Sequence, residues 1–271
     1  MIWNWQIFSS GYGYWLPTAL QVLFILFELG LGFRSGFATF DRRELLASVG
    51  VGAAQKLAAL VLGTAGFMRV LFFAYDHRVL DAHFSPWLMF VCAFVLVDFA
   101  QYASHIFSHY NRWGWATHVI HHTPERVNFS VGFRLGVPRL ITLISIALIA
   151  VCWLAGMPPL LVLTCNSLNM LYQFFSHTEL IPRLRWVEYV FCTPSTHRVH
   201  HGYNPEYLNR NFGAVFTIFD RLFGTFREED YSIPIRYGLG RPVPKGLGPL
   251  LIFGWRELAV EILTGKKTGA R

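Results

Sequence analysis

Hydrophobic positions along the chain fall into long uninterrupted blocks rather than into an alternating pattern. Three such blocks cover about residues 16–33, residues 45–67 and the stretch from residue 87 to the first histidines. Each block approaches the roughly 20 apolar residues that a helix needs to cross a bilayer. We therefore predict three membrane-spanning helices. Lys56 lies inside the second, where a charge is costly and has to find a partner or reach the membrane surface.

Two shorter apolar blocks follow, at residues 140–154 and 160–175, and a Gly-Met-Pro-Pro turn separates them. Each is shorter than a full span needs, so we predict a helical hairpin that barely crosses the bilayer or re-enters it. Residues 69–86 are mixed in character and are predicted to form a loop on the opposite side of the membrane. Both ends of the hairpin then emerge on the side where the third span ends.

Composition and charge support this membrane topology. The chain is 54% hydrophobic and 14% charged, against about 25% charged in average chains, and its mean hydropathy is +0.38. Of its 23 Lys and Arg residues, 20 fall on the side where the third span ends. The positive-inside rule places that side in the cytoplasm, at the inner membrane of a bacterium or the endoplasmic reticulum of a eukaryote. No basic stripe or binding motif accompanies the net charge of +7, which argues against a nucleic-acid partner.

These observations predict an all-α integral membrane protein with about four transmembrane helices, counting the short or re-entrant hairpin. A cytoplasmic helical cap completes the expected fold. We expect one domain over residues 1–271, with a catalytic core at about 87–231 and an interfacial C-terminal segment at about 232–271. The four cysteines are scattered without a Cys-x-x-Cys pair, so neither a disulfide framework nor a zinc knuckle is predicted.

Nine of the 11 histidines are concentrated in four places: a His-x-x-x-His box, two His-x-x-His-His boxes and one isolated position. Residues at i, i+3 and i+4 share a helix face, so the members of each box are expected to point the same way. Neutral imidazoles are the commonest nitrogen ligands for transition metals, and nine of them indicate two metals. His77 and His83 lie outside the boxes and are expected to be ordinary. The nine candidate metal ligands are His105, His109, His118, His121, His122, His177, His197, His200 and His201.

Two further polar features lie on apolar helices close to the boxes. Asp98 precedes His105 by seven positions on the same helix face, where its carboxylate can orient a ligand imidazole or can simply pair with a neighbouring helix. Asn166, Asn169 and Gln173 form a stripe that leads to the isolated histidine. This stripe can face a substrate channel or make interhelical hydrogen bonds, and the pattern is compatible with either role.

The stretch from residue 98 to residue 226 resembles the fatty acid hydroxylase superfamily of membrane di-iron enzymes, also called the sterol desaturase family. The resemblance rests on the three boxes, on His177 with Gln173 before it, and on the motifs Asn-Arg-Asn-Phe-Gly at 209–213 and Phe-Asp-Arg-Leu-Phe-Gly-Thr at 219–225. The runs at 122–128 and 193–202 are similar to those of the branch that contains the alkylglycerol monooxygenases.

The resemblance implies a di-iron monooxygenase that hydroxylates or desaturates a lipid C–H position. It implies two iron ions on the nine histidines, with Asp98, Asn128 and Gln173 as further catalytic residues, O2 as oxidant and a lipid substrate drawn from the bilayer. Imidazole also suits zinc, so zinc is an alternative occupant. The chain carries no Rossmann glycine fingerprint and no haem motif, so electrons are expected from a separate reductase, ferredoxin, cytochrome b5 or reduced pterin.

Two alternatives share parts of this pattern. A hydroxylase or desaturase that acts on sterol or carotenoid rings has the same ligands and differs in the shape of its substrate pocket. A histidine-rich metal transporter belongs to another functional class, and its ligands line a path near the middle of the bilayer. Clustering of the histidines at helix ends and in the cap favours an enzyme over a transporter.

Overall fold

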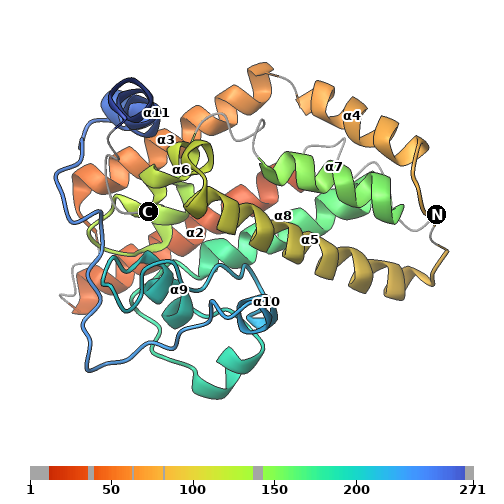
Figure 1. Ribbon diagram of the computed structural model, residues 1–271. Helices are drawn as coiled ribbons and strands as arrows, with labels where there is room; N and C mark the ends of the chain where they lie inside the picture. Colours follow the sequence, from red (N-terminus) through yellow and green to blue (C-terminus); the bar gives the residue numbers. More distant parts are fainter. Residues whose placement is uncertain (1–11, 36–39, 63, 82, 137–142, 266–271) are drawn as a thin grey trace.

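A computed structural model describes residues 12–35, 40–62, 64–81, 83–136 and 143–265. Within these ranges the chain is helical and forms no strand, and Phe191 and Phe216 make one isolated bridge. The predicted helical class is confirmed (Figure 1). The elements are α2 (Tyr12–Ser35), α3 (Arg42–Leu62), α4 (Thr64–Asp76), α5 (Pro86–Tyr110), α6 (Arg112–His118), η1 (Val119–His122), η2 (Phe129–Phe133), α7 (Leu143–Ala155), α8 (Pro159–Phe175), η4 (Arg185–Tyr189), α9 (Pro194–His201), α10 (Ile218–Leu222) and α11 (Leu247–Thr264).

Helix α5 is the central element, because α6, α7 and α8 all pack against it. Its small and branched residues Ala93 and Val97 are fully buried against Cys152 of α7 and Leu161 of α8. Burial of this apolar surface holds the three long helices side by side (Figure 1). Helix α4 covers α7 from the other side, through Leu71.

The predicted hairpin is present as α7 and α8, although the first residues of the 140–154 block lie outside the described ranges. Pro158 precedes α8 and Gly156 adopts a left-handed backbone conformation, so the chain turns sharply between the two helices. Val79 of the 77–85 loop donates a hydrogen bond to the carbonyl oxygen of Trp153 at 2.7 Å. The loop and the hairpin turn therefore share one end of the bundle, and α5 and α8 run from there toward the histidines.

The predicted second span and the loop after it were wrong in their boundaries. Instead of one helix at 45–67, the chain forms α3 up to Leu62 and α4 from Thr64, and residues 69–76 belong to α4 rather than to a loop. The apolar run continues as far as Ala74, which is buried with Leu71. Burying these side chains stabilises a packed helix over an irregular loop in this stretch. The expected partner of Lys56 is present, because its ammonium group donates a hydrogen bond to the Thr18 hydroxyl at 2.7 Å.

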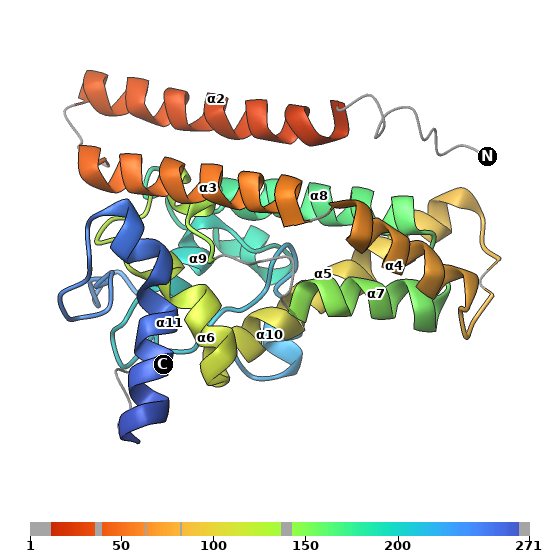
Figure 2. The same ribbon diagram turned by 90° about the horizontal axis from the view of Figure 1, so that it is seen from above.

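Two described helices are long and apolar enough to cross a membrane: α2 over Pro17–Arg34 and α5 over Pro86–Tyr110. Helix α7 is strongly apolar but shorter. Large apolar side chains such as Leu23, Phe27 and Phe33 stand exposed on α2, as on a surface that faces lipid or another protein. Figure 2 shows α2 and α3 along one side of the molecule.

The irregular chain between α8 and α11, residues 176–246, is here called the cap. It carries η4, α9 and α10, and it packs at the end of the bundle where α5 and α8 finish (Figures 1 and 2). Glu28 of α2 is fully buried there and accepts hydrogen bonds from the Thr178 hydroxyl at 2.6 Å and from the Phe129 amide at 2.8 Å. A carboxylate of the first described helix thus fixes the start of the cap.

Candidate metal centre

The structure brings all nine predicted histidines together, in two groups. Within each group one ring nitrogen of every member lies within 4.8 Å of the others. The five-histidine group consists of His105, His109, His118, His122 and His200. The four-histidine group consists of His121, His177, His197 and His201.

The end of α5 and several short helical elements position these side chains. His105 and His109 lie one turn apart at the end of α5, and Asn111 then caps α6 by accepting a hydrogen bond from the Trp113 amide at 2.9 Å. Thr193 caps α9 in a reciprocal capping box with Thr196, and proline follows in the first turn. These caps start both short helices at defined residues, and the boxes therefore keep a fixed orientation.

Each His-x-x-His-His box divides between the two groups, which corrects the expectation that its members point in one direction. The first box gives His118 and His122 to the five-histidine group and His121 to the other. The second box does the reverse, because His200 alone joins the five-histidine group. In α9, with 3.6 residues per turn, positions i+3 and i+4 lie on opposite sides of position i, while the first box passes from the end of α6 into the 3-10 helix η1. A box seated between two centres can therefore serve both.

The ring nitrogens converge as metal ligands do. Backbone carbonyl oxygens accept from Nδ1 of His105 (Phe212, 3.0 Å), His177 (Gln173, 2.7 Å) and His200 (Arg210, 3.0 Å). Because a carbonyl only accepts, Nδ1 carries the proton in these neutral rings and Nε2 presents a lone pair. Nitrogen Nε2 of His177 lies 3.2 Å from Nε2 of His121 and 2.8 Å from Nε2 of His197. Ring nitrogens gathered this closely fit a cation bound between them.

Burial keeps the rings neutral and ready to bind. It lowers the pKa of His177 to about 4 and holds the pKa values of His118, His197 and His200 well below the usual range. Among the described residues, the buried Nε2 atoms of His109 and His200 have no hydrogen-bond partner. Imidazole suits iron and zinc, whereas calcium and magnesium require oxygen ligands. Both groups therefore fit a transition metal.

The segment at residues 209–213 orients three rings of the five-histidine group. The Asn209 side-chain oxygen lies 3.3 Å from Nδ1 of His109, and the carbonyls of Arg210 and Phe212 accept from His200 and His105. Asn209 and Asn211 both have positive φ, which asparagine tolerates better than most residues. The motif was noted in the sequence, but its role was missed, since main-chain carbonyls leave no side-chain signature.

Two buried carboxylates accept hydrogen bonds from backbone amides of this segment and of the residues that follow it. Asp220 accepts from the amides of Phe212 at 2.8 Å and Gly213 at 2.7 Å. Asp98 accepts from the amides of Val215 at 2.9 Å and Phe216 at 3.1 Å. Among the described contacts Asp98 makes no hydrogen bond to a ligand ring, and the amides that it binds closely follow the 209–213 segment.

The amide stripe is mostly occupied with contacts between helices. Asn169 donates to Asp98 at 2.6 Å and its side-chain oxygen accepts from Gln173 at 2.6 Å. Asn166 accepts from Gln101 of α5 at 2.7 Å.

Asn128 caps η2 by accepting from the amide and the hydroxyl of Ser130. Of the three predicted catalytic residues, Gln173 alone lines the cavity described below, and its carbonyl also orients His177.

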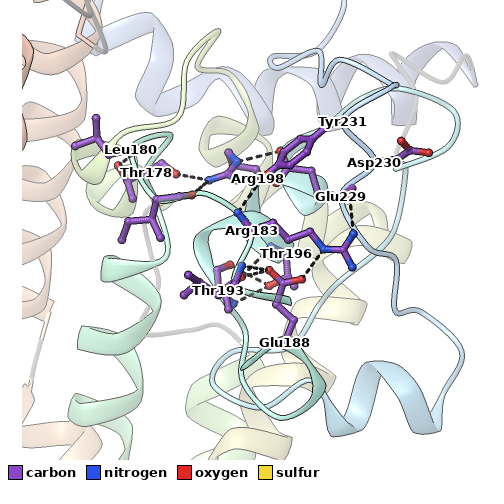
Figure 3. Close-up of polar contacts among 12 residues, drawn as sticks. Thr178, Leu180, Arg183, Glu188, Thr193, Thr196, Arg198, Glu229, Asp230 and Tyr231 are labelled. Carbon is purple, nitrogen blue, oxygen red and sulfur yellow. Dashed lines mark hydrogen bonds and ion pairs between the residues drawn. The ribbon is translucent and has the colours of Figure 1, made fainter. Parts of the chain in front are cut away.

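Arg198, inside the second His-x-x-His-His box, ties α9 to the rest of the cap (Figure 3). Its guanidinium pairs with Glu229 at 2.6 Å and donates to the carbonyls of Thr178 at 3.1 Å and Ile181 at 2.7 Å. Thr178 directly follows His177. One buried cation therefore fixes the distance between His177 and the helix that carries the other two cap ligands of its group.

A cavity of about 360 Å³ opens beside both histidine groups. This volume lies in the lower part of the range for pockets that bind small molecules. Its wall includes His105 and His118 of one group and His121, His177 and His197 of the other. The wall is otherwise mostly apolar, with amide and hydroxyl groups among the apolar side chains. The apolar members include Leu135, Ile144, Met170, Phe174 and Trp255, and the polar ones include Gln21, Gln101, Ser104, Ser108 and Gln173.

His77 and His83 belong to neither group, as expected. Nitrogen Nδ1 of His77 lies 2.9 Å from the carbonyl oxygen of Phe73, and the exposed His83 pairs with Asp81 at 3.3 Å. Both lie in the 77–85 loop at the far end of the bundle.

Replacing Asn209 with Ala should weaken metal binding by the five-histidine group by about 10- to 100-fold, because partners that orient ligand imidazoles typically contribute this much. Metal content after competition with a graded series of chelators would measure the change. Asn209→Gly is the matched control, since glycine tolerates the positive φ of this position. If Asn209→Gly retains wild-type metal affinity, the side-chain contact with His109 is unimportant.

Comparison with known proteins agrees with this architecture. The fatty acid hydroxylase family model matches residues 90–225, half of the chain, and that span contains all nine histidines. The chain is 33% identical over 207 residues to human alkylglycerol monooxygenase, covering 74% of this chain and 44% of that protein. It is 37% identical over 155 residues to the Caenorhabditis elegans alkylglycerol monooxygenase, covering 57% and 30%.

Ornithine lipid hydroxylase OlsE of Rhizobium tropici is 27% identical over 215 residues, which cover 77% of this chain and 64% of that protein. The chain spans about half the length, or less, of the alkylglycerol monooxygenases that it matches. No solved structure matches it. The resemblance inferred from the histidine boxes, including that to the alkylglycerol monooxygenase branch, is confirmed. The chain belongs to the fatty acid hydroxylase family.

Proposed function

We propose that the protein is an integral membrane monooxygenase that hydroxylates a lipid C–H position with O2 and two iron ions. The observation that carries this proposal is the pair of buried histidine groups beside a mostly apolar cavity. One iron would be held by the five-histidine group and the other by the four-histidine group. When bound, the iron pair would supply the two-electron activation of O2 that an unactivated C–H bond requires.

The residues of the chain have three tasks in this reaction. The nine histidines hold the metals through neutral nitrogens, and the segment at 209–213 keeps three of the rings oriented. The apolar wall, including Met170 and Phe174, would hold the lipid chain and exclude water from the reacting carbon. Gln101, Ser104 and Gln173 are polar residues of the same wall, and their amide and hydroxyl groups would be the ones to hydrogen-bond an oxygen of the substrate.

The names of the relatives indicate the substrate class. The names contain an alkylglycerol and an ornithine lipid, and each is a polar head joined to a hydrocarbon portion. We propose a substrate of this general form, which enters from the bilayer and reaches the metals with its hydrocarbon portion. Desaturation of the same chain would use the same ligands and is included in the proposal.

Electrons and location complete the proposed function. A separate donor, which can be a reductase, ferredoxin, cytochrome b5 or reduced pterin, would reduce the iron pair. The concentration of Lys and Arg on the histidine side supports a cytoplasmic metal site.

A transporter would need ligands along a path through the bilayer. Here the ligands are gathered at the ends of α5 and α8 and enclosed by α9, which supports a fixed catalytic centre.

The test is turnover by purified protein in lipid nanodiscs under ¹⁸O2, with a reductant and candidate lipids such as an alkylglycerol. Mass spectrometry should find a hydroxylated product that carries one ¹⁸O atom. A parallel reaction in H2¹⁸O with ordinary O2 controls for exchange. A product whose new oxygen comes only from water would end the monooxygenase assignment, while loss of two hydrogens without added oxygen would indicate desaturation.

A further inference from the structure

Two cap segments present large apolar side chains that are each more than half exposed. Helix α10 exposes Ile218 and Leu222, with Phe223 directly after it, and η4 exposes Trp186 and Tyr189. Trp186 is 78% exposed and Leu222 is 71% exposed. Isolated apolar residues on a surface are ordinary, but five large ones on two neighbouring segments mark an interaction site. We call this surface the α10–η4 ledge.

The two segments form one surface because several contacts join them. The carbonyl oxygen of Glu188 in η4 accepts from the Thr217 hydroxyl at 3.1 Å and from Arg221 at 3.0 Å. The Arg221 guanidinium also lies over the Tyr189 ring at 5.1 Å and the Phe226 ring at 3.8 Å. The Arg221 guanidinium therefore contacts the cap, and the outer side of α10 consists of its apolar residues.

The position of the ledge follows from its packing against α5. The ring of Phe219 lies 5.2 Å from that of Phe99, and the ring of Phe223 lies 5.6 Å from that of Tyr102. At 1.5 Å per residue, Phe99 lies about 20 Å along α5 from its start at Pro86. The hydrocarbon core of a bilayer is about 30 Å thick. If α5 spans the membrane, which is part of the proposed function, α10 packs beside the last third of that span.

The chemistry of the surroundings points to lipid rather than to another protein. The apolar face of α5 that leads to α10 is itself exposed, through Val91, Val95 and Phe99, so a lipid-facing surface continues onto the ledge. Trp186 and Tyr189 are the residue types that collect at the level of the headgroups. Arg185, exposed beside Trp186, is placed to meet anionic headgroups.

We propose that the α10–η4 ledge is embedded in the membrane leaflet on the histidine side, with Ile218, Leu222 and Phe223 among the acyl chains and Trp186 and Tyr189 at the headgroups. The embedded helix is connected to the five-histidine group. Asp220 of α10 binds the amides of Phe212 and Gly213, and the Phe212 carbonyl orients His105. Contact with the leaflet therefore sets the depth of that group relative to the bilayer.

Site-directed spin labelling tests the ledge. Single cysteines at Leu222, Val95 and Glu206 would be labelled in nanodiscs that contain anionic lipid, with Cys92, the least buried native cysteine, replaced by Ala throughout. Power saturation compares collisions with O2, which concentrates in the bilayer, and with a water-soluble nickel chelate. Val95, on the exposed face of α5, is the lipid reference, and Glu206, exposed in the cap, is the aqueous one. The label at position 222 should match Val95, with O2 relaxing it several-fold more than nickel does.

Each other outcome contradicts the proposal in a distinguishable way. If position 222 behaves like Glu206 while Val95 is in lipid, the ledge faces water and the membrane assignment of α5 stands. If both positions behave like Glu206, α5 does not span and the proposed membrane function fails with the ledge. If both reagents are excluded from position 222, a protein covers the surface, either a second copy or another partner.

Discussion

Replacing either His121 or His200 with Ala should lower lipid hydroxylation by more than about 100-fold, beyond the loss typical of an outer partner of a metal ligand. His121 is the one residue that the first His-x-x-His-His box gives to the four-histidine group, and His200 is its counterpart from the second box. Each substitution removes a nitrogen from a different centre. Turnover assays and iron analysis of the purified variants should therefore both respond, with iron falling below two ions per chain.

The matched control is His77→Ala, which removes an exposed imidazole at the far end of the bundle. It should retain wild-type iron content and turnover. Full iron content and activity in His121→Ala would show that the four-histidine group is not a metal centre. Thermal unfolding of each variant without metal would separate loss of ligation from loss of folding.

Replacing Arg198 with Ala should lower the free energy of unfolding by about 3–5 kcal/mol, the usual cost of removing one partner of a buried ion pair. The substitution leaves the buried Glu229 carboxylate without its cation and takes the donor from the carbonyls of Thr178 and Ile181. Because these contacts fix His177 against α9, iron binding by the four-histidine group should weaken as well. Denaturant unfolding in a mild detergent, with iron analysis, would measure both effects.

Two controls sharpen this experiment. Arg78→Ala breaks an ion pair with Asp81 in the loop at the far end, where both side chains meet solvent, so stability should change little. Adding Glu229→Gln to Arg198→Ala removes the stranded charge and should recover part of the loss. Wild-type stability of Arg198→Ala would contradict the role of the guanidinium in holding the cap.

The sequence predicted the long apolar helices and the membership of the histidine cluster well, for physical reasons that are local. Helix α5 follows from an apolar run that begins at Pro86, and the hairpin follows from two apolar blocks around glycine and proline. The histidines were identified because imidazoles repeated at helical spacing suit metal ligation and would repel one another if they were protonated. These signals do not depend on what lies opposite each residue.

The features that the sequence did not predict depend on contacts between distant segments. Helical spacing placed Asp98 on the face of His105, but its partners, Val215 and Phe216, lie more than a hundred residues later. The division of each box between two centres depends on where α9 sits relative to α5 and η1. The continuation of α4 as far as Asp76 was not predicted either, because hydropathy alone does not mark where a helix ends.

The reciprocal use of the boxes has a consequence for biosynthesis. His200 completes the five-histidine group, and His197 and His201 complete the four-histidine group, so a single eight-residue helix supplies the final ligands of both. As the ribosome releases the chain, neither centre can close until α9 has emerged and docked at the end of the bundle. Both centres therefore become competent to take up metal at the same stage, after the helices from α2 to α8 have been made.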